Sequence, residues 1–291
     1  MTDEFRHPRC YARELGECSP KLSREHYISR QLCEHVMQGE GSTVQADFFR
    51  AKVSVLPPSS DLFVARNLCV KHNNALSELD EQALHFFHTA ERIERHLLDT
   101  TRPIVARFRV SGDKLERWFL KSLCGFVASG NALHRGKQLG KITPSLDWLR
   151  ILFGLEQMPP EWGLYGRGFT DVEKAAGGLS LGTLINEQNV VIGCIGSIRN
   201  WGFLLAMTKP ILGGNGGLLE DAVFHPLRYS FETPNDDRYA FLELDWGIKS
   251  KGGQYNIMFE NRHDMQSGYN SRRDVDSKPK RPRKPPKPRR Q

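Results

Sequence analysis

The sequence lacks a long hydrophobic run. No stretch of the 291 residues approaches the roughly 18 apolar residues of a transmembrane helix. The opening segment, MTDEFRHPRC, is polar and lacks the apolar core of a secretory signal. We therefore expect no membrane association and a cytoplasmic protein in which disulfides are unlikely. Cysteine is scarce as well, and four of the six cysteines fall within the first 69 residues.

Acidic residues are missing from KPKRPRKPPKPRR, residues 278–290, which holds eight Lys/Arg and five Pro. The formal net charge of the chain is +7, so the remainder without these eight charges carries about −1. Prolines lack a backbone donor and like charges repel, so residues 271–291 are expected to form a disordered basic tail. Such a tail favours salt-dependent, sequence-independent binding to nucleic acid, and the alternative is a solubilising segment.

Phosphate-binding and dinucleotide-binding motifs are also lacking. The glycine-rich stretches GLYGRGF (163–169) and LGGNGGL (212–218) do not have the spacing of either motif, and we interpret both as loops. No repeat of 20 to 50 residues is present.

Hydrophobic periodicity predicts a helical middle. Apolar residues recur at helical spacing over 74–98, and Pro103 lies beyond the end of that helix. Two further helices are predicted over 111–130 and 145–154, and a strand over 103–110. A short helix is expected at QLCEHVM, residues 31–37, inside an apparent insertion at 33–60.

Beyond about residue 180 the pattern changes to β-branched and aromatic runs separated by Gly, Pro and Asn, which predicts an antiparallel sheet. The expected fold class is therefore α+β. We divide the chain into an N-terminal module at 1–98, an α+β domain of unknown role at 99–270 and the tail. The second of these is expected to position a substrate or a protein partner.

Four residues of the N-terminal module have the chemistry of a zinc site. Cys69 and His72 form a C-x-x-H pair, and Cys10 and Cys18 lie upstream. A tight turn aims both side chains of such a pair at one ion, and thiolates with an imidazole can complete a tetrahedral zinc site. The alternative is a set of unrelated residues with buried cysteines.

With EH at 25–26 before a strand and CxxHN at 69–73 opening a helix, residues 8–85 resemble the HNH endonuclease (ββα-metal) family. The resemblance implies that His26 is the general base and that Glu25 and Asn73 hold a catalytic Mg²⁺ or Mn²⁺ ion. It implies that Asn67 helps to hold the histidine, and Asn74 is the alternative to Asn73. The zinc ion would be structural.

The chemistry of these residue types agrees with phosphodiester hydrolysis. A histidine that titrates near neutral pH suits a general base, and carboxylate and amide oxygens suit Mg²⁺ or Mn²⁺. Asp80 is expected to be a solvated helix acid, with a contribution to the metal site as the alternative, and His85 and His88 to be packing or surface residues.

The expected function is a metal-dependent endonuclease that cleaves DNA with a single HNH site. The alternative is a non-catalytic zinc-stapled module that binds nucleic acid or a protein. In a third interpretation, the C-terminal part carries the function and the zinc module only stabilises the fold.

Removing residues 278–291 should weaken nucleic-acid binding without altering cleavage at saturating protein. If about half of the eight charges contact phosphates, the log–log salt dependence of affinity should flatten by roughly 3 to 4 units. Affinities of the full-length and truncated proteins at several salt concentrations measure this. An unchanged salt slope would identify the tail as a solubilising segment.

Overall fold

The computed structural model describes most of the chain between residues 5 and 258. The described ranges are 5–38, 44–46, 63–99, 101, 104–134, 137–169, 179–199, 201–209, 222–233, 238–247 and 254–258. The predicted disordered tail, the loop at 212–218 and most of the predicted insertion lie outside these ranges. Within them the protein is mixed α+β, as the sequence predicts.

The helices agree closely with the hydrophobic periodicity. They are α1 (Arg30–Gln38), α2 (Val70–Ala75), α3 (Ser77–Leu98), α4 (Gly112–Ser129), α5 (Leu146–Leu152) and a short 3-10 helix, η1 (Arg13–Leu15). Thus the predicted helix over 74–98 is confirmed as α3, and the predicted helices over 111–130 and 145–154 as α4 and α5.

Local sequence explains the ends of α4. At its start the hydroxyl of Ser111 accepts a hydrogen bond from the backbone N–H of Lys114. At its end Gly130 adopts a left-handed conformation with φ of 80°, which glycine tolerates without a steric penalty.

Two larger sheets form the β-rich part. The first has the order β11-β7-β10-β9-β8-β2 and the second the order β14-β12-β13-β4, beside the two-stranded pairs β1-β3 and β5-β6. The strands of the six-stranded sheet are β2 (Val44–Ala46), β7 (Gly163–Phe169), β8 (Leu179–Ile185), β9 (Val191–Ile198), β10 (Trp201–Ala206) and β11 (Val223–Phe224). Those of the four-stranded sheet are β4 (Val105–Ser111), β12 (Arg228–Thr233), β13 (Arg238–Asp245) and β14 (Gln254–Met258). The short strands are β1 (Glu25–His26), β3 (Val64–Ala65), β5 (Leu133–His134) and β6 (Lys137–Gln138).

The predicted single antiparallel sheet is only partly correct. The β8-β9 and β12-β13 neighbours are antiparallel, whereas β12 pairs parallel with β14. Two strands from before residue 180 also join in parallel, β2 beside β8 and β4 beside β13. Strands this far apart in sequence are joined by tertiary packing, which the composition of each strand does not reveal.

The interpretation of GLYGRGF as a loop is wrong, because this segment is the strand β7, between β10 and β11. The side chain of Tyr229 explains one of its glycines: a Cβ at Gly166 would lie 2.0 Å from the Tyr229 hydroxyl oxygen. Here glycine permits close packing of a strand rather than a turn.

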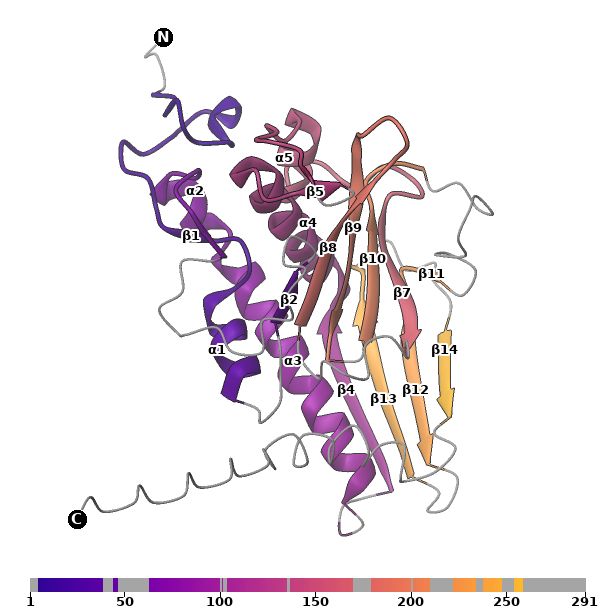
Figure 1. The fold of residues 1–291 in the computed structure, drawn as a ribbon. Helices are drawn as coiled ribbons and strands as arrows, with labels where there is room; N and C mark the ends of the chain where they lie inside the picture. Colours follow the sequence, from indigo (N-terminus) through magenta and orange to yellow (C-terminus); the bar gives the residue numbers. More distant parts are fainter. Residues whose placement is uncertain are drawn as a thin grey trace, which may run out of the picture.

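Helix α3 is the central element of the fold. It packs against α1, α4, β4 and β13, so it lies between the N-terminal elements and the sheets (Figure 1). One hydrophobic core joins residues from Cys10 to Trp246. The predicted domain boundary at residue 98 coincides with the end of α3, and residues on both sides of it belong to this one core. The division into domains stays a prediction.

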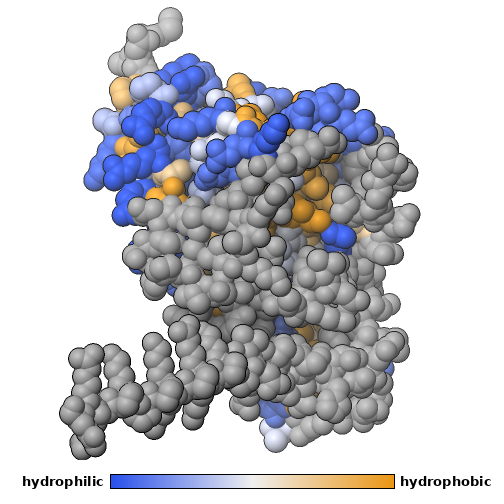
Figure 2. All heavy atoms as spheres, viewed as in Figure 1, coloured by the Kyte–Doolittle hydropathy of each residue, from blue (hydrophilic) through white to orange (hydrophobic). Residues whose placement is uncertain are grey.

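Hydrophilic side chains cover much of the described surface over the N-terminal elements in the view of Figure 2, with only small orange areas between them. Among the described residues, no helix combines the length and apolar character that a membrane crossing would demand.

Candidate metal centre and the His26 strand

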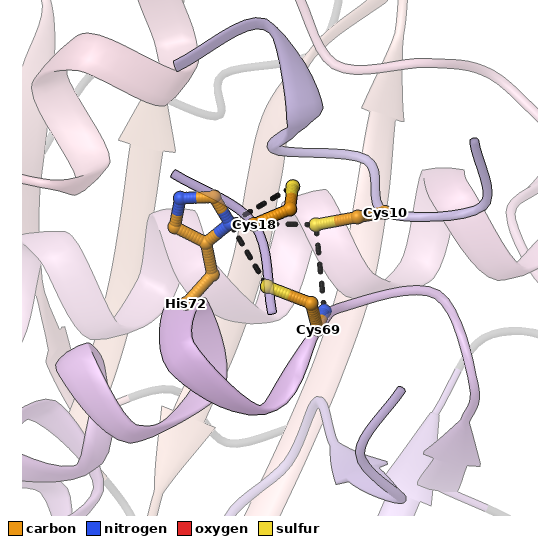
Figure 3. A group of neighbouring side chains, drawn as sticks. All are labelled: Cys10, Cys18, Cys69 and His72. Carbon is orange, nitrogen blue, oxygen red and sulfur yellow. Dashed lines mark hydrogen bonds between the residues drawn. The ribbon is translucent and has the colours of Figure 1, made fainter. Parts of the chain in front are cut away.

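Cys10, Cys18, Cys69 and His72 converge on one point, although the first two precede the other two by about 50 residues or more. Cys69 is the N-cap of α2 and His72 lies in its first turn, so the helix start presents both side chains on one side (Figure 3). The N-terminal segment runs alongside: the N–H of Tyr11 donates to the carbonyl of Asn67, and that of Val70 donates to Lys21. These bonds hold the two halves of the cluster in register.

The geometry fits a tetrahedral zinc ion. Nδ1 of His72 lies close to all three sulfur atoms, at 3.4 Å from Cys10, 3.8 Å from Cys18 and 3.3 Å from Cys69. Bonds of about 2.3 Å to sulfur and about 2.0 Å to nitrogen at tetrahedral angles place S and N roughly 3.5 Å apart. All four residues are buried, as in closed structural zinc sites. The predicted ligands therefore come together, and the cluster could hold a metal ion of the zinc type.

Without a cation the thiols of this cluster are hard to ionise together. Burial raises the pKa of Cys10 and of Cys18. Burial also opposes ionisation of Cys69, but hydrogen bonds from the backbone of His72 and Ser19 outweigh it and lower the pKa of Cys69. In addition, the N–H of Cys69 donates to Sγ of Cys10 at 3.4 Å. A divalent cation would compensate the thiolate charge that burial otherwise disfavours, so metal binding should release protons.

Glu25 and His26 occupy the two positions of β1, which pairs antiparallel with β3. Successive side chains of a strand point to opposite faces, and the burial agrees: Glu25 is fully buried and His26 is half-buried. The structure thus does not bring the two side chains to a common face.

Glu25 lies in the protein interior. Its Oε1 accepts a hydrogen bond of 3.1 Å from the hydroxyl of Tyr11, and its Oε2 is buried with no hydrogen-bond partner among the described residues. Burial raises the pKa of Glu25 to about 7, against the opposing effect of Lys121. Near neutral pH the carboxyl group is therefore partly protonated, in contrast to the ionised ligand that the sequence suggests.

A buried lysine, which the sequence analysis missed, organises this region. Nζ of Lys121 lies 2.7 Å and 2.8 Å from the two carboxylate oxygens of Asp80 and 3.1 Å from the carbonyl of His26. Asp80 also accepts a 2.7 Å hydrogen bond from the hydroxyl of Ser29. The interpretation of Asp80 as a solvated acid is therefore wrong, because it holds a buried cation. The available signal was a lysine at 121 between the apolar residues of the second half of α4, in the run WFLKSLCGFVA.

His26 has a cationic environment. Burial lowers its pKa, and the charges of Arg30, Lys121 and Arg24 lower it further. The imidazole is therefore neutral at pH 7 and keeps a free lone pair.

The predicted asparagines lie near the cluster. Asn67 precedes Leu68 and Cys69, and its side-chain oxygen and nitrogen are buried with no hydrogen-bond partner among the described residues. Asn73 follows His72 in α2 and is half-buried, whereas Asn74 is exposed. No described hydrogen bond joins these side chains to that of His26.

Comparisons with known proteins returned no matching family model, no matching curated protein and no matching solved structure.

Cys69→Ser should remove the bound metal and destabilise the N-terminal segment, because three ligands without the fourth hold zinc weakly and the segment has little regular structure. Metal analysis should find about one zinc per wild-type chain and much less in the variant. Cys33→Ser is the matched control, since Cys33 is a buried free cysteine outside the cluster. Equal zinc content in both variants would contradict the assignment.

Glu25→Gln should remove a pH dependence of stability. The folded-state pKa of about 7 lies above the unfolded value of 4.5, so the contribution of Glu25 is present below pH 4.5 and is lost as pH rises to 7. The loss is on the order of 3 kcal/mol. Denaturant unfolding of both proteins from pH 4.5 to 8 measures it as the wild-type minus variant difference, which cancels other titrating groups. A constant difference would show that Glu25 is already ionised across this range.

Proposed function

We propose that the N-terminal module is a DNA endonuclease of the HNH type in which His26 is the general base. The observation that carries the proposal is the environment of His26: a half-buried imidazole of lowered pKa with Arg30, Lys121 and Arg24 as its cationic neighbours.

A neutral imidazole can accept the proton of the attacking water. Because its pKa is lowered, His26 is less than half protonated at pH 6.5, where an ordinary histidine is half protonated, so more of the base keeps its lone pair at mildly acidic pH. The carbonyl of His26 is fixed by Nζ of Lys121 at 3.1 Å, which limits movement of the strand that carries the base.

The cations near His26 support a phosphate-bearing substrate. Arg24 and Arg30 are exposed at either side of β1, and their positive charge would attract a phosphodiester and stabilise charge that develops on its oxygens. Arg30 also forms a 2.6 Å ion pair with Glu34, so a phosphate would compete with the Glu34 carboxylate for the Arg30 guanidinium.

The order of the elements agrees with the resemblance. The short β1-β3 pair is followed by α2, and the cysteine–histidine cluster lies where the N-terminal segment meets the start of α2. A structural zinc ion there would hold β3 and α2 in place around the strand of His26.

The donor set does not fit a catalytic Mg²⁺ or Mn²⁺ ion held by Glu25 and Asn73. Glu25 is fully buried on the strand face opposite His26, and this burial raises its pKa. The ammonium group of Lys121 is already its charged neighbour. An ion held there would not reach a phosphate beside His26, so no catalytic step is assigned to one. Of the two residues, only Asn73 is half-buried and close enough to the surface to contact a substrate.

The buried position of Glu25, which does not suit a catalytic metal ion, favours a second candidate function. A module in which Lys121 pairs with Asp80 and Glu25 holds no divalent cation can still bind nucleic acid through Arg24 and Arg30 without cutting it. The zinc-stapled binding module is therefore the alternative. The basic tail would contribute to nucleic-acid affinity under either function.

His26→Ala should abolish plasmid cleavage and leave DNA binding largely unchanged. Removal of a general base lowers the rate by on the order of 10²–10⁴-fold. Cleavage by the wild type should persist below pH 6.5, because the pKa of His26 is lowered. Cleavage is measured as nicking over time across pH, with Mg²⁺, with Mn²⁺ and with EDTA.

His85→Ala is the control, since His85 is an exposed histidine of α3 that contacts the carbonyl of Arg109. If His26→Ala cuts as fast as His85→Ala, His26 is not the base. If the wild type binds DNA but does not cut it under any metal condition, the binding-module function is correct.

A further inference from the structure

Three potential metal ligands meet between α1 and α3, away from the cysteine cluster. They are His35 of α1 and, one turn apart on α3, His88 and Glu91. One donor atom of each lies within 4.8 Å of the others. His88 is predicted from the sequence as a packing or surface residue, and its spacing to His35 in the sequence gives no sign that the two meet.

One ring nitrogen of each imidazole lies close to the same carboxylate oxygen of Glu91. Nε2 of His35 lies 3.4 Å from Oε2 of Glu91, and Nδ1 of His88 lies 3.5 Å from the same atom. Ligands bound at about 2.0–2.1 Å and at tetrahedral angles are roughly 3.4 Å apart. Each imidazole nitrogen therefore already lies at the distance from Oε2 of Glu91 that a tetrahedral ion requires.

The other oxygen of Glu91 is held in place. Oε1 accepts a 3.0 Å hydrogen bond from Arg199, whose side chain is 5% exposed and also pairs with Glu94. Arg199 adopts a left-handed backbone conformation with φ of 56°, which is unfavourable for a bulky residue. Its guanidinium lies over the ring of Phe87. These contacts orient the carboxylate and leave Oε2 directed at the histidines, as partners of metal ligands do.

The site is open to solvent. The side chains of His35, His88 and Glu91 are 33%, 41% and 25% exposed, so an ion can enter and can keep a water or another ligand. Three protein ligands with one free position are typical of accessible zinc sites, whereas closed structural sites use four.

The competing explanation is an ion pair between protonated histidines and Glu91. The ring centroids of His35 and His88 are 4.2 Å apart with an interplanar angle of 76°, so two imidazolium charges would repel each other at close range. Arg199 already supplies Glu91 with a positive partner. One divalent cation between two neutral imidazoles avoids this repulsion and uses both lone pairs.

The geometry points to a second metal site in this protein, in which His35, His88 and Glu91 bind Zn²⁺ or a similar first-row divalent ion and leave one coordination position open. The ion connects α1 to α3. It is independent of the nuclease proposal and of the cysteine cluster, and soft thiolate ligands play no part in it.

The test is a titration of the full chain with its cysteine cluster already loaded with zinc. Isothermal titration calorimetry with added Zn²⁺ should detect one further ion per wild-type chain. His88→Ala and His35→Ala should weaken this second binding event by at least about tenfold, whereas the exposed His85→Ala control on the same helix should keep it. His88→Gln preserves more of the side-chain volume and serves if the alanine variant unfolds.

Two readouts separate this site from the first. Added Co²⁺ should give the wild type a spectrum without thiolate-to-metal charge transfer, and this spectrum should be absent from His88→Ala. Added Zn²⁺ should raise the melting temperature of the wild type and His85→Ala but not of the His88 variants. A wild type that binds only the ion of the cysteine cluster, or a His88→Ala variant that binds the second ion as tightly as the wild type, would overturn the proposal.

Discussion

The convergence of Cys10, Cys18, Cys69 and His72 is the constraint on which the N-terminal half depends. The segment that carries the first two cysteines contains only the short helix η1 as a helix. Its position beside residues 67–70 is set by a few backbone hydrogen bonds and by this cluster. A metal ion held there would fix the start of α2 and, through β3, the pairing of the strand that holds His26. Small regions without a core of their own commonly use metal in this way.

A second constraint lies beneath the same strand. Lys121 is almost fully buried, and a buried ammonium group is costly unless it is paired and hydrogen-bonded. Asp80 provides two oxygens and the carbonyl of His26 a third. With Asp80 ionised, the pair is neutral, and a second ionised carboxylate at Glu25 would leave a net buried charge. Burial raises the pKa of Glu25, the charge of Asp80 adds to this effect, and Lys121 opposes it. The buried carboxyl group of Glu25 and the half-buried imidazole of His26 therefore have separate chemical environments.

Much of the helical framework and the Cys69–His72 pair of the cysteine cluster were predictable from the sequence, because both depend on short-range spacing. Apolar periodicity located α3 and α4, and the C-x-x-H pair located Cys69 and His72. The environment of Glu25 was not predictable, since it depends on Lys121 from a helix nearly a hundred residues later. The strand β7 was missed because its glycines suggest turns, while their purpose in the fold is to admit neighbours such as Tyr229. His35 and His88 are likewise joined only by the packing of α1 on α3.

Helix α3 links the two ends of the N-terminal half. Near its start Asp80 holds Ser29, the last residue before α1, and further along His88 and Glu91 meet His35 of α1. The chain from Ser29 to His35 is therefore joined to one helix at both ends, at Ser29 by a hydrogen bond and at His35 by the proposed ion. Because a helix is stiff over three turns, a tighter contact of His35 with α3 would restrict the positions that Ser29 can take beside Asp80. The position of the strand that carries His26 thus depends on elements beyond β1, β3 and α2, in agreement with the single core that these elements share with the sheets.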